Sequence, residues 1–225
     1  MSAWLNTSEP RLLLDELRAL PLLAVLRPVR PLEAKARIAL LNAAGLRHVE
    51  IAWSPWPGWS QECDELARCF PTMRFGAASV RTLQALEAAH HAGFSFAVSP
   101  VLDPQLLAAA RQLGITLVPG VFSPTEVQQA VGLGCTAVKL FPANALGPSY
   151  WSSLSGALGP LPFCIAAGGL GVADLSGWLE AGVNALALGS RLFAVASGVG
   201  APPALDPGLT RWVQAYPSAF HQRLH

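Results

Sequence analysis

The stretch ITLVPGVFSPTEVQQAVGLGCTAVKLFP, residues 115–142, contains a strand-like run, a helical segment and a second strand-like run in direct succession. Short apolar runs with few polar positions are typical of strands that are buried on both faces. Between them, Ser-Pro suits the N-cap and first turn of a helix, and the closing glycine suits a helix C-cap. The stretch therefore predicts one strand–helix–strand unit of an α/β fold.

The same pattern recurs along nearly the whole chain. The strand-like runs are LLAVLRP, RHVEIAW, RFGAASV, FSFAVSP, ITLVPGVF, TAVKLFP, PFCIAAGG and ALALGSRL. Helical segments rich in Ala and Leu lie between several of them, and each of these segments ends in glycine. Eight such units in 225 residues predict an α/β protein with the (β/α)₈ TIM-barrel fold. A doubly wound open sheet is the alternative, although no GxGxxG follows the first strand-like run.

No linker or shift in composition divides the chain, so we expect a single domain over residues 1–225. Residues 1–20 have acids and arginines spaced through them, which predicts a short amphipathic helix and does not match a signal peptide. The barrel is expected over residues 21–194. A loop and a last helix are expected over residues 195–225.

Composition excludes several classes of partner. The net charge is +1, which gives no electrostatic basis for binding nucleic acid or an anionic membrane surface. Mean hydropathy is +0.40, yet no apolar run approaches the ~18 residues that a membrane span needs. The four cysteines form no CxxC motif and show no paired histidine spacing, so we expect reduced thiols in the cytoplasm and no metal site.

Lys139 and Glu50 are charged residues within apolar strand runs. Alternation along a strand puts Lys139 on the face opposite Val138 and Leu140, whose branched side chains suit packing against outer helices. The same alternation puts Glu50 on the face opposite Ile51. Both charges are therefore predicted to point into the barrel.

Two interpretations of this pair are open. The chain holds two lysines against thirteen arginines. Burial can keep a lysine partly neutral and nucleophilic, which arginine's high pKa prevents. An amine nucleophile beside a carboxylate indicates Schiff-base chemistry on a carbonyl substrate. The alternative is an interior ion pair that fixes the barrel, although buried pairs are weak stabilisers.

Other polar or glycine positions fall at strand ends, where TIM barrels place their chemistry. Gly168–Gly169 and Gly189–Ser190 would let backbone N–H groups approach a phosphate, although glycine pairs are also common in ordinary turns. Arg27, at the end of the first strand, could hold a carboxylate through two hydrogen bonds or form a salt bridge at the rim.

The chain resembles the 2-keto-3-deoxy-6-phosphogluconate and phosphogalactonate aldolases, in order from about residue 21 to residue 194. The likeness rests on HVEIAWS, FGAASV, FAVSPVLDPQLL, LVPGVFSPTE, AVKLFPANALGPSY, AAGG and ALGSRLF. AVLR, the proline after WS, and GPSY are more similar to the phosphogalactonate branch. The resemblance implies a class I aldolase that uses no metal or other cofactor, and a homotrimer.

Carried over by position, the resemblance implies that Lys139 is the Schiff-base lysine and Glu50 the proton-shuttling glutamate. It also implies that Arg27 holds substrate, and Ser79 stands where the family usually has a threonine that binds pyruvate's carboxylate. The other substrate-binding positions that it implies are Pro100 and Phe141 in the pocket wall and Gly168, Gly169, Gly189 and Ser190 in a phosphate cradle.

Two substitutions depart from the family pattern. Ser54 stands where the phosphogluconate branch has an arginine, and Ala167 stands where a threonine usually precedes the glycine pair. In addition, a loop that is less aromatic in the relatives here contains Trp53, Trp56 and Trp59.

We therefore expect an enzyme that cleaves a 2-keto-3-deoxy sugar acid phosphate to pyruvate and glyceraldehyde 3-phosphate. One alternative keeps the lysine but acts on 4-hydroxy-2-oxoglutarate or oxaloacetate. Another is a sugar-phosphate isomerase or epimerase without a Schiff base. A non-catalytic phosphate-binding barrel is the third, and the inward lysine and glutamate argue against it.

Overall fold

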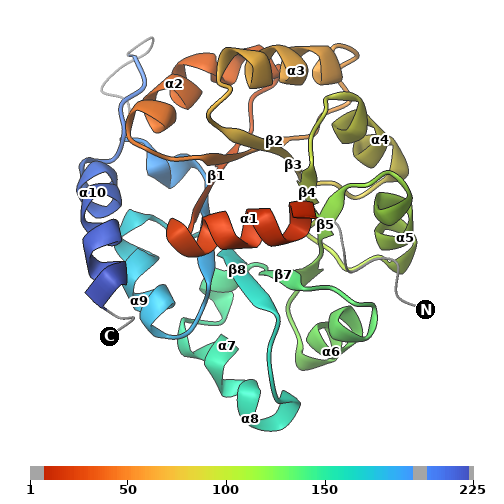
Figure 1. The fold of residues 1–225 in the computed structure, drawn as a ribbon, viewed down its shortest axis with the longest axis vertical. Helices are drawn as coiled ribbons and strands as arrows, with labels where there is room; N and C mark the ends of the chain where they lie inside the picture. The colour runs from red at the N-terminus through yellow and green to blue at the C-terminus, as the bar shows by residue number, and fades with distance from the viewer. Residues whose placement is uncertain (1–7, 195–201, 223–225) are drawn as a thin grey trace.

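Parallel strands form a closed ring, and helices surround it (Figure 1). The computed structural model describes residues 8–194 and 202–222. Each pairing between strands is parallel, and the order in the sheet is β5-β4-β3-β2-β1-β9-β8-β7-β6. The strands are β1 (Leu22–Leu26), β2 (His48–Ala52), β3 (Arg74–Ala78), β4 (Phe96–Val98), β5 (Thr116–Val118), β6 (Gly120–Val121), β7 (Ala137–Leu140), β8 (Phe163–Ala167) and β9 (Ala185–Leu188).

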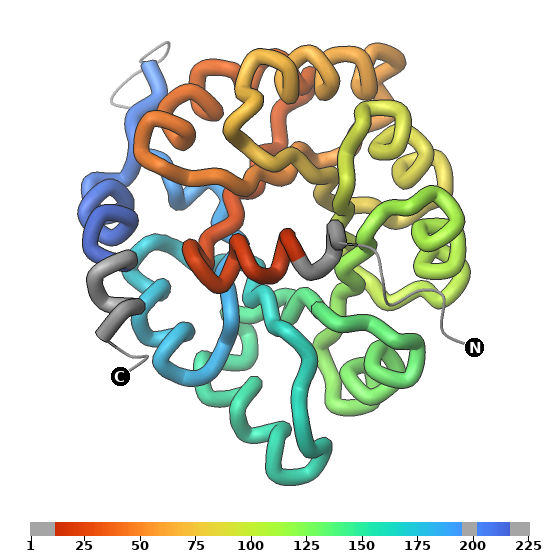
Figure 2. Tube along the Cα trace, in the orientation of Figure 1, coloured from red at the N-terminus to blue at the C-terminus, as the bar shows by residue number. Residues whose placement is uncertain are grey.

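The chain runs once around the ring and forms helices on its outside (Figure 2). The α-helices are α1 (Ser8–Ala19), α2 (Lys35–Ala43), α3 (Trp59–Cys69), α4 (Leu83–His91), α5 (Pro104–Gln112), α6 (Pro124–Gly132), α7 (Ser149–Ser153), α8 (Ser155–Leu158), α9 (Leu175–Glu180) and α10 (Pro207–Gln222). Short 3₁₀ helices are η1 (Pro31–Ala34), η2 (Ala143–Ala145), η3 (Val172–Asp174) and η4 (Ser190–Leu192).

The ring closes at a strand that proline interrupts. β5 pairs with β4 and β6 pairs with β7, and Pro119 alone separates β5 from β6. Proline has no N–H to donate to a sheet. Its carbonyl still accepts a hydrogen bond from the Lys139 N–H at 2.8 Å. β5 and β6 therefore act as one barrel strand, and the predicted eight-stranded TIM barrel is confirmed.

Two apolar clusters form on the two faces of the strands, as alternation predicts. Val138 and Leu140 of β7 belong to the larger cluster, which lies between the strands and the outer helices. Ala137 of β7 belongs to a second cluster, which includes barrel-interior residues and Leu13 and Leu17 of α1. The inward direction predicted for the Lys139 face is therefore confirmed.

α1 lies across one end of the barrel (Figure 1). Leu13, Leu14 and Leu17 are buried against the barrel interior. The predicted helix at residues 1–20 is confirmed over Ser8–Ala19. Among the helices that the structure describes, none combines the length and apolar character needed to cross a bilayer.

Some local expectations need correction. Trp59 is not in a loop: it is the first residue of α3, it is 2% exposed, and its Nε1 donates to the Ala52 carbonyl at 3.0 Å. The expected final helix is α10, which begins at Pro207. Part of the loop expected before it, residues 195–201, lies outside the described residues.

Candidate functional site

The predicted site residues meet at the carboxyl end of the barrel, because the strands are parallel and each residue lies in or just after one of them. Glu50 lies in β2 and Lys139 in β7. The others directly follow a strand or lie one or two residues beyond it: Arg27 after β1, Ser79 after β3, Pro100 after β4, Phe141 after β7, Gly168 and Gly169 after β8, and Gly189 and Ser190 after β9.

Lys139 and Glu50 are buried inside the ring, with 3% and 0% of their surface exposed. Burial lowers the pKa of Lys139; the charge of Glu50 opposes this shift and that of Arg27 adds to it. Burial also raises the pKa of Glu50, and the positive charges of Lys139 and Arg27 oppose this shift. Both groups are therefore displaced towards their neutral forms, an amine and a carboxylic acid.

The two groups influence each other without direct contact. Within the described part of the chain, no salt bridge joins Lys139 to Glu50, and neither carboxylate oxygen of Glu50 has a hydrogen-bond partner. A buried polar group left unsatisfied costs about 1–3 kcal/mol, so such a group is more often explained by function than by stability. This arrangement disfavours the alternative of an ion pair that fixes the barrel.

Arg27 and Ser79 are joined across Glu50's strand. An Nη1 group of Arg27 donates to the Ser79 hydroxyl at 2.7 Å. Ser79 has a φ of 61°, the left-handed region that residues other than glycine adopt at a cost. The two donors are thus held together at the mouth, one strand away from Glu50 on either side. The alternative of a salt bridge at the rim finds no support, because the partner of Arg27 is a hydroxyl.

Phe141 forms the wall beside Lys139. The Lys139 Nζ atom lies 5.4 Å from the centroid of the Phe141 ring. The face of an aromatic ring attracts an ammonium, so the lowered pKa of Lys139 comes from its burial as a whole and not from this ring. Pro100 is half-buried at the end of β4. Among the described residues, the contacts of Lys139 do not include Pro100.

The turn after β8 needs glycine. Gly168 and Gly169 have φ values of 99° and 74°. A Cβ atom on Gly168 would lie 3.1 Å from the Phe141 ring, and one on Gly169 would lie 2.5 Å from the Asn144 side chain. Both φ values lie in the left-handed region, where a side chain strains the backbone, and a Cβ on Gly169 would also force the Asn144 side chain to move. The exposed backbone of this turn therefore depends on glycine.

The two family departures have different surroundings. Ala167 is the last residue of β8, faces the barrel interior and is 3% exposed. Its methyl group therefore lies where the hydroxyl of the family's usual threonine would face the site. The Ser54 hydroxyl donates to the Val29 carbonyl at 3.4 Å, outside the strands.

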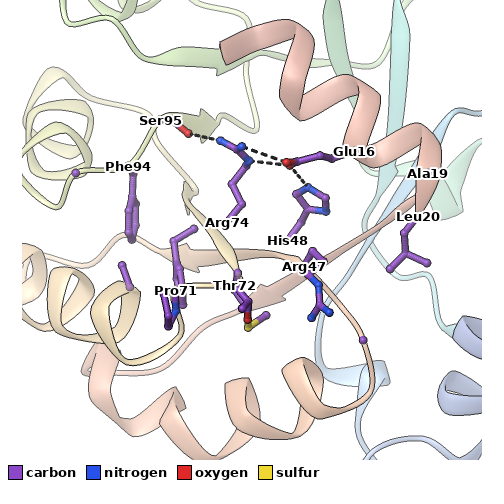
Figure 3. Close-up of a pocket in the computed structure, with 15 residues that line it drawn as sticks. Glu16, Ala19, Leu20, Arg47, His48, Pro71, Thr72, Arg74, Phe94 and Ser95 are labelled. Carbon is purple, nitrogen blue, oxygen red and sulfur yellow. Dashed lines mark hydrogen bonds and ion pairs between the residues drawn. The ribbon is translucent and has the colours of Figure 1, made fainter. Parts of the chain in front are cut away.

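Sequence reasoning missed a polar network at the opposite end of the barrel (Figure 3). Glu16 of α1 accepts from Arg74 Nε at 2.8 Å and lies 3.0 Å from His48 Nε2. Arg74 also donates to the Ser95 hydroxyl at 3.2 Å. A surface hollow of about 620 Å³ lies beside these residues. The sequence signal for this network was an acid, Glu16, on an amphipathic helix. A position on a helix does not indicate which strand residues such an acid will contact.

No cluster of three or more metal-binding side chains occurs among the residues that the structure describes. The four cysteines are free thiols, and Cys63 and Cys164 are buried.

Comparisons with known proteins agree with this geometry. Residues 13–201 match the family described as "Aldolase: KDPG and KHG aldolase". The 2-dehydro-3-deoxy-6-phosphogalactonate aldolase of Escherichia coli (strain K12) is 31% identical over 181 residues, which cover 80% of this chain and 88% of the relative.

Two solved structures share the fold. One is described as "Native KDPGal structure", with a TM-score of 0.73 and 28% identity, covering 91% of this chain and 96% of the other. The second is KDPG aldolase from Legionella pneumophila with pyruvate captured as a covalent carbinolamine intermediate, with a TM-score of 0.69 and 25% identity, covering 90% and 93% of the two chains. A match that spans most of the barrel, together with these relatives, shows that the chain is a lyase and belongs to the KDPG and KHG aldolase family.

Proposed function

We propose that the chain cleaves 2-dehydro-3-deoxy-6-phosphogalactonate or -gluconate to pyruvate and glyceraldehyde 3-phosphate through a Schiff base on Lys139. The observation that carries the proposal is the buried, unpaired Lys139 and Glu50, both displaced towards their neutral forms. A neutral amine has the lone pair that attack on a carbonyl requires.

Lys139 starts the reaction by adding to the C2 carbonyl, which gives a carbinolamine. Loss of water from the carbinolamine gives an iminium. When the C4 hydroxyl loses its proton, the C3–C4 bond breaks and its electron pair moves into the iminium, so the aldehyde leaves and an enamine remains. Protonation at C3 and hydrolysis release pyruvate and the free amine.

Glu50 moves the protons in these steps. Its raised pKa favours the acid form, which can give a proton to the hydroxyl that leaves the carbinolamine. The resulting carboxylate then accepts the proton of the C4 hydroxyl. One residue thus serves first as acid and then as base, which a carboxyl group with an ordinary pKa does less well near neutral pH.

The two ends of the substrate bind to different strands. Arg27 and Ser79 offer donors to the carboxylate beside C2, because they are already positioned together next to Glu50's strand. Gly168, Gly169, Gly189 and Ser190 offer backbone and hydroxyl donors to the distal phosphate. Pro100 and Phe141 line the wall between them.

Borohydride trapping tests the Schiff base. Sodium borohydride with pyruvate is expected to inactivate the protein and to add a reduced pyruvyl mass to the peptide that contains Lys139. Lys35, the first residue of α2, is exposed and serves as the control within the same chain. An adduct on Lys35 alone, or no adduct, would contradict the proposal and favour an isomerase or epimerase.

A second candidate is cleavage of 4-hydroxy-2-oxoglutarate or decarboxylation of oxaloacetate by the same lysine. Ala167 favours it, because a hydroxyl is missing from the distal part of the pocket. One lost hydrogen bond costs about 1–3 kcal/mol, roughly ten- to a hundredfold, which several remaining donors can outweigh. We therefore expect the phosphorylated substrate to have the highest kcat/KM of the three, and Ala167→Thr to increase its lead. A higher kcat/KM for oxaloacetate or 4-hydroxy-2-oxoglutarate would favour the second candidate.

We also propose that the chain acts as one domain, as a homotrimer, in the cytoplasm. Family resemblance supports the trimer and the free cysteines support a reducing compartment. Light scattering of the purified protein measures the number of subunits.

A further inference from the structure

Two polar side chains outside the predicted site flank the glycine turn after β8. A Cβ atom built on Gly169 would lie 2.5 Å from Nδ2 of Asn144 and 2.6 Å from its Cγ. A Cβ atom built on Gly171 would lie 3.1 Å from Cδ of Arg191 and 3.4 Å from its Cβ. The amide and the arginine chain therefore pack against the same turn, two residues apart.

Neighbouring strands bring them there. Asn144 lies in η2 after β7, and its N–H donates to the Gly168 carbonyl at 3.2 Å. Arg191 lies in η4 after β9, directly behind Ser190. Because β8 lies between β7 and β9, the turn after β8 is bordered by both. Both side chains are exposed, so a ligand seated on the turn can meet them.

The acids close to Arg191 accept hydrogen bonds from backbone N–H groups. Asp174 accepts from the Gly171 N–H at 2.7 Å. Asp206, whose own N–H donates to the Leu192 carbonyl at 2.9 Å, accepts from the Gly208 N–H at 2.7 Å. Arg191 forms no ion pair with any residue that the structure describes, and residues 195–201 contain no acid. By contrast, Arg30 at the same end is paired with Glu62.

We propose that Asn144 and Arg191 are specificity-determining residues that bind the distal phosphate of the substrate. This inference rests on the proposed cleavage of a phosphorylated keto acid and assigns its phosphate preference to two side chains. The amide of Asn144 offers N–H donors, and the guanidinium of Arg191, two bonds beyond Cδ, offers charged donors suited to phosphate oxygens. Together they offset the hydroxyl that Ala167 lacks.

The test compares two substrates that differ only in the phosphate: the phosphorylated six-carbon keto acid and the same acid without phosphate. Arg191→Met is expected to lower kcat/KM for the phosphorylated acid roughly ten- to a hundredfold, mainly through KM. The kcat/KM for the unphosphorylated acid is expected to change less than about twofold. Asn144→Ala is expected to lower kcat/KM for the phosphorylated acid about threefold to tenfold. Inorganic phosphate is expected to inhibit Arg191→Met more weakly than the wild type.

Arg81→Met is the matched control. Arg81 is an exposed arginine at the same end of the barrel, three residues after the end of β3, and its replacement removes the same unit of charge. Borohydride trapping with pyruvate checks that each variant is folded. An equal loss in Arg81→Met and Arg191→Met would overturn the proposal, because only the general charge would matter.

Two further outcomes would also overturn it. Equal losses on both substrates would mean that Arg191 supports the pocket rather than the phosphate. If the wild type prefers the phosphorylated acid and Arg191→Met keeps this preference, the proposed function stands and this inference is wrong. If the wild type itself shows no such preference while Lys139 still forms the adduct, phosphate recognition is wrong at both levels.

Discussion

Glu16 and Glu50 lie towards opposite ends of the same barrel, and their pKa values are shifted in opposite directions from the ordinary value of 4.5. Glu16 accepts hydrogen bonds from Arg74, and this contact is the main cause of its lowered pKa. Glu50 has no hydrogen-bond partner among the described residues, and burial raises its pKa. Identical side chains are therefore used in different ways.

The comparison separates stability from chemistry. At the amino end, Glu16 holds α1 on the barrel through partners from β2 and β3, His48 and Arg74 (Figure 3). At the carboxyl end, Lys139 and Glu50 are desolvated and no salt bridge joins them in the described part of the chain, which lowers stability but keeps both groups reactive. We expect substitutions at the first end to affect unfolding, and those at the second to affect turnover.

Lys139→Met should produce the largest effect. Without the amine there is no covalent intermediate, so kcat should fall on the order of 10⁶-fold and no borohydride adduct should form. Lys139 is buried and forms no salt bridge with a described residue, so removing it also removes the cost of burying a charge, and the midpoint of thermal unfolding should stay or rise. A clear drop in that midpoint would contradict the comparison and restore the structural ion pair.

Glu50→Gln should have the next largest effect. The amide keeps the shape of the side chain but cannot shuttle protons, so turnover should fall by a factor of roughly 10²–10⁴. A slow adduct with pyruvate should still form, because Lys139 is intact. Turnover near the wild-type rate would show that the carboxyl group is structural.

Arg27→Met should have a smaller effect that is confined to binding. Its guanidinium lies with Ser79 beside Glu50, so KM should rise roughly ten- to a hundredfold for phosphorylated and unphosphorylated substrates alike. Steady-state kinetics with both substrates measures this. A loss limited to the phosphorylated substrate would place Arg27 at the distal end of the pocket, and our assignment would be wrong.

Glu16→Gln should have the smallest effect, and on stability alone. The Glu16 side chain is 37% exposed, so after discounting for solvent the charged contact is worth only about 1 kcal/mol. A lowered pKa adds stability above pH 4.5 that is lost as pH falls through the folded-state value. Glu16→Gln should therefore destabilise the protein at pH 7 and become neutral in acid, with turnover within about twofold.

Glu50→Gln provides the opposite pH trend. A raised pKa adds stability that is complete below pH 4.5 and lost as pH rises through the folded-state value. The free energy of unfolding of Glu50→Gln relative to wild type should therefore improve as pH rises. Denaturant unfolding from about pH 3 to 7 checks both signs, because the Glu16 contribution is lost below pH 4.5 and the Glu50 contribution above it. Trends of the same sign in the two variants would contradict the comparison.

The sequence determined the barrel and the direction of its inward residues. Repeated strand and helix patterns predicted the fold, and alternation placed Lys139 and Glu50 inside. These features are local, because the period of a strand is set by its own backbone. The parallel order of the strands then brought the predicted strand-end residues to one end of the barrel.

Tertiary structure decided what each inward group touches. That Glu16 reaches Arg74 and His48, that Glu50 stays without a partner, and that Asn144 and Arg191 border one glycine turn all depend on how α1 docks and how the ring closes. These contacts join segments far apart in sequence, and small changes in packing would alter them. Local patterns assign a side chain to a face, whereas its partners depend on which segments the closed barrel brings together.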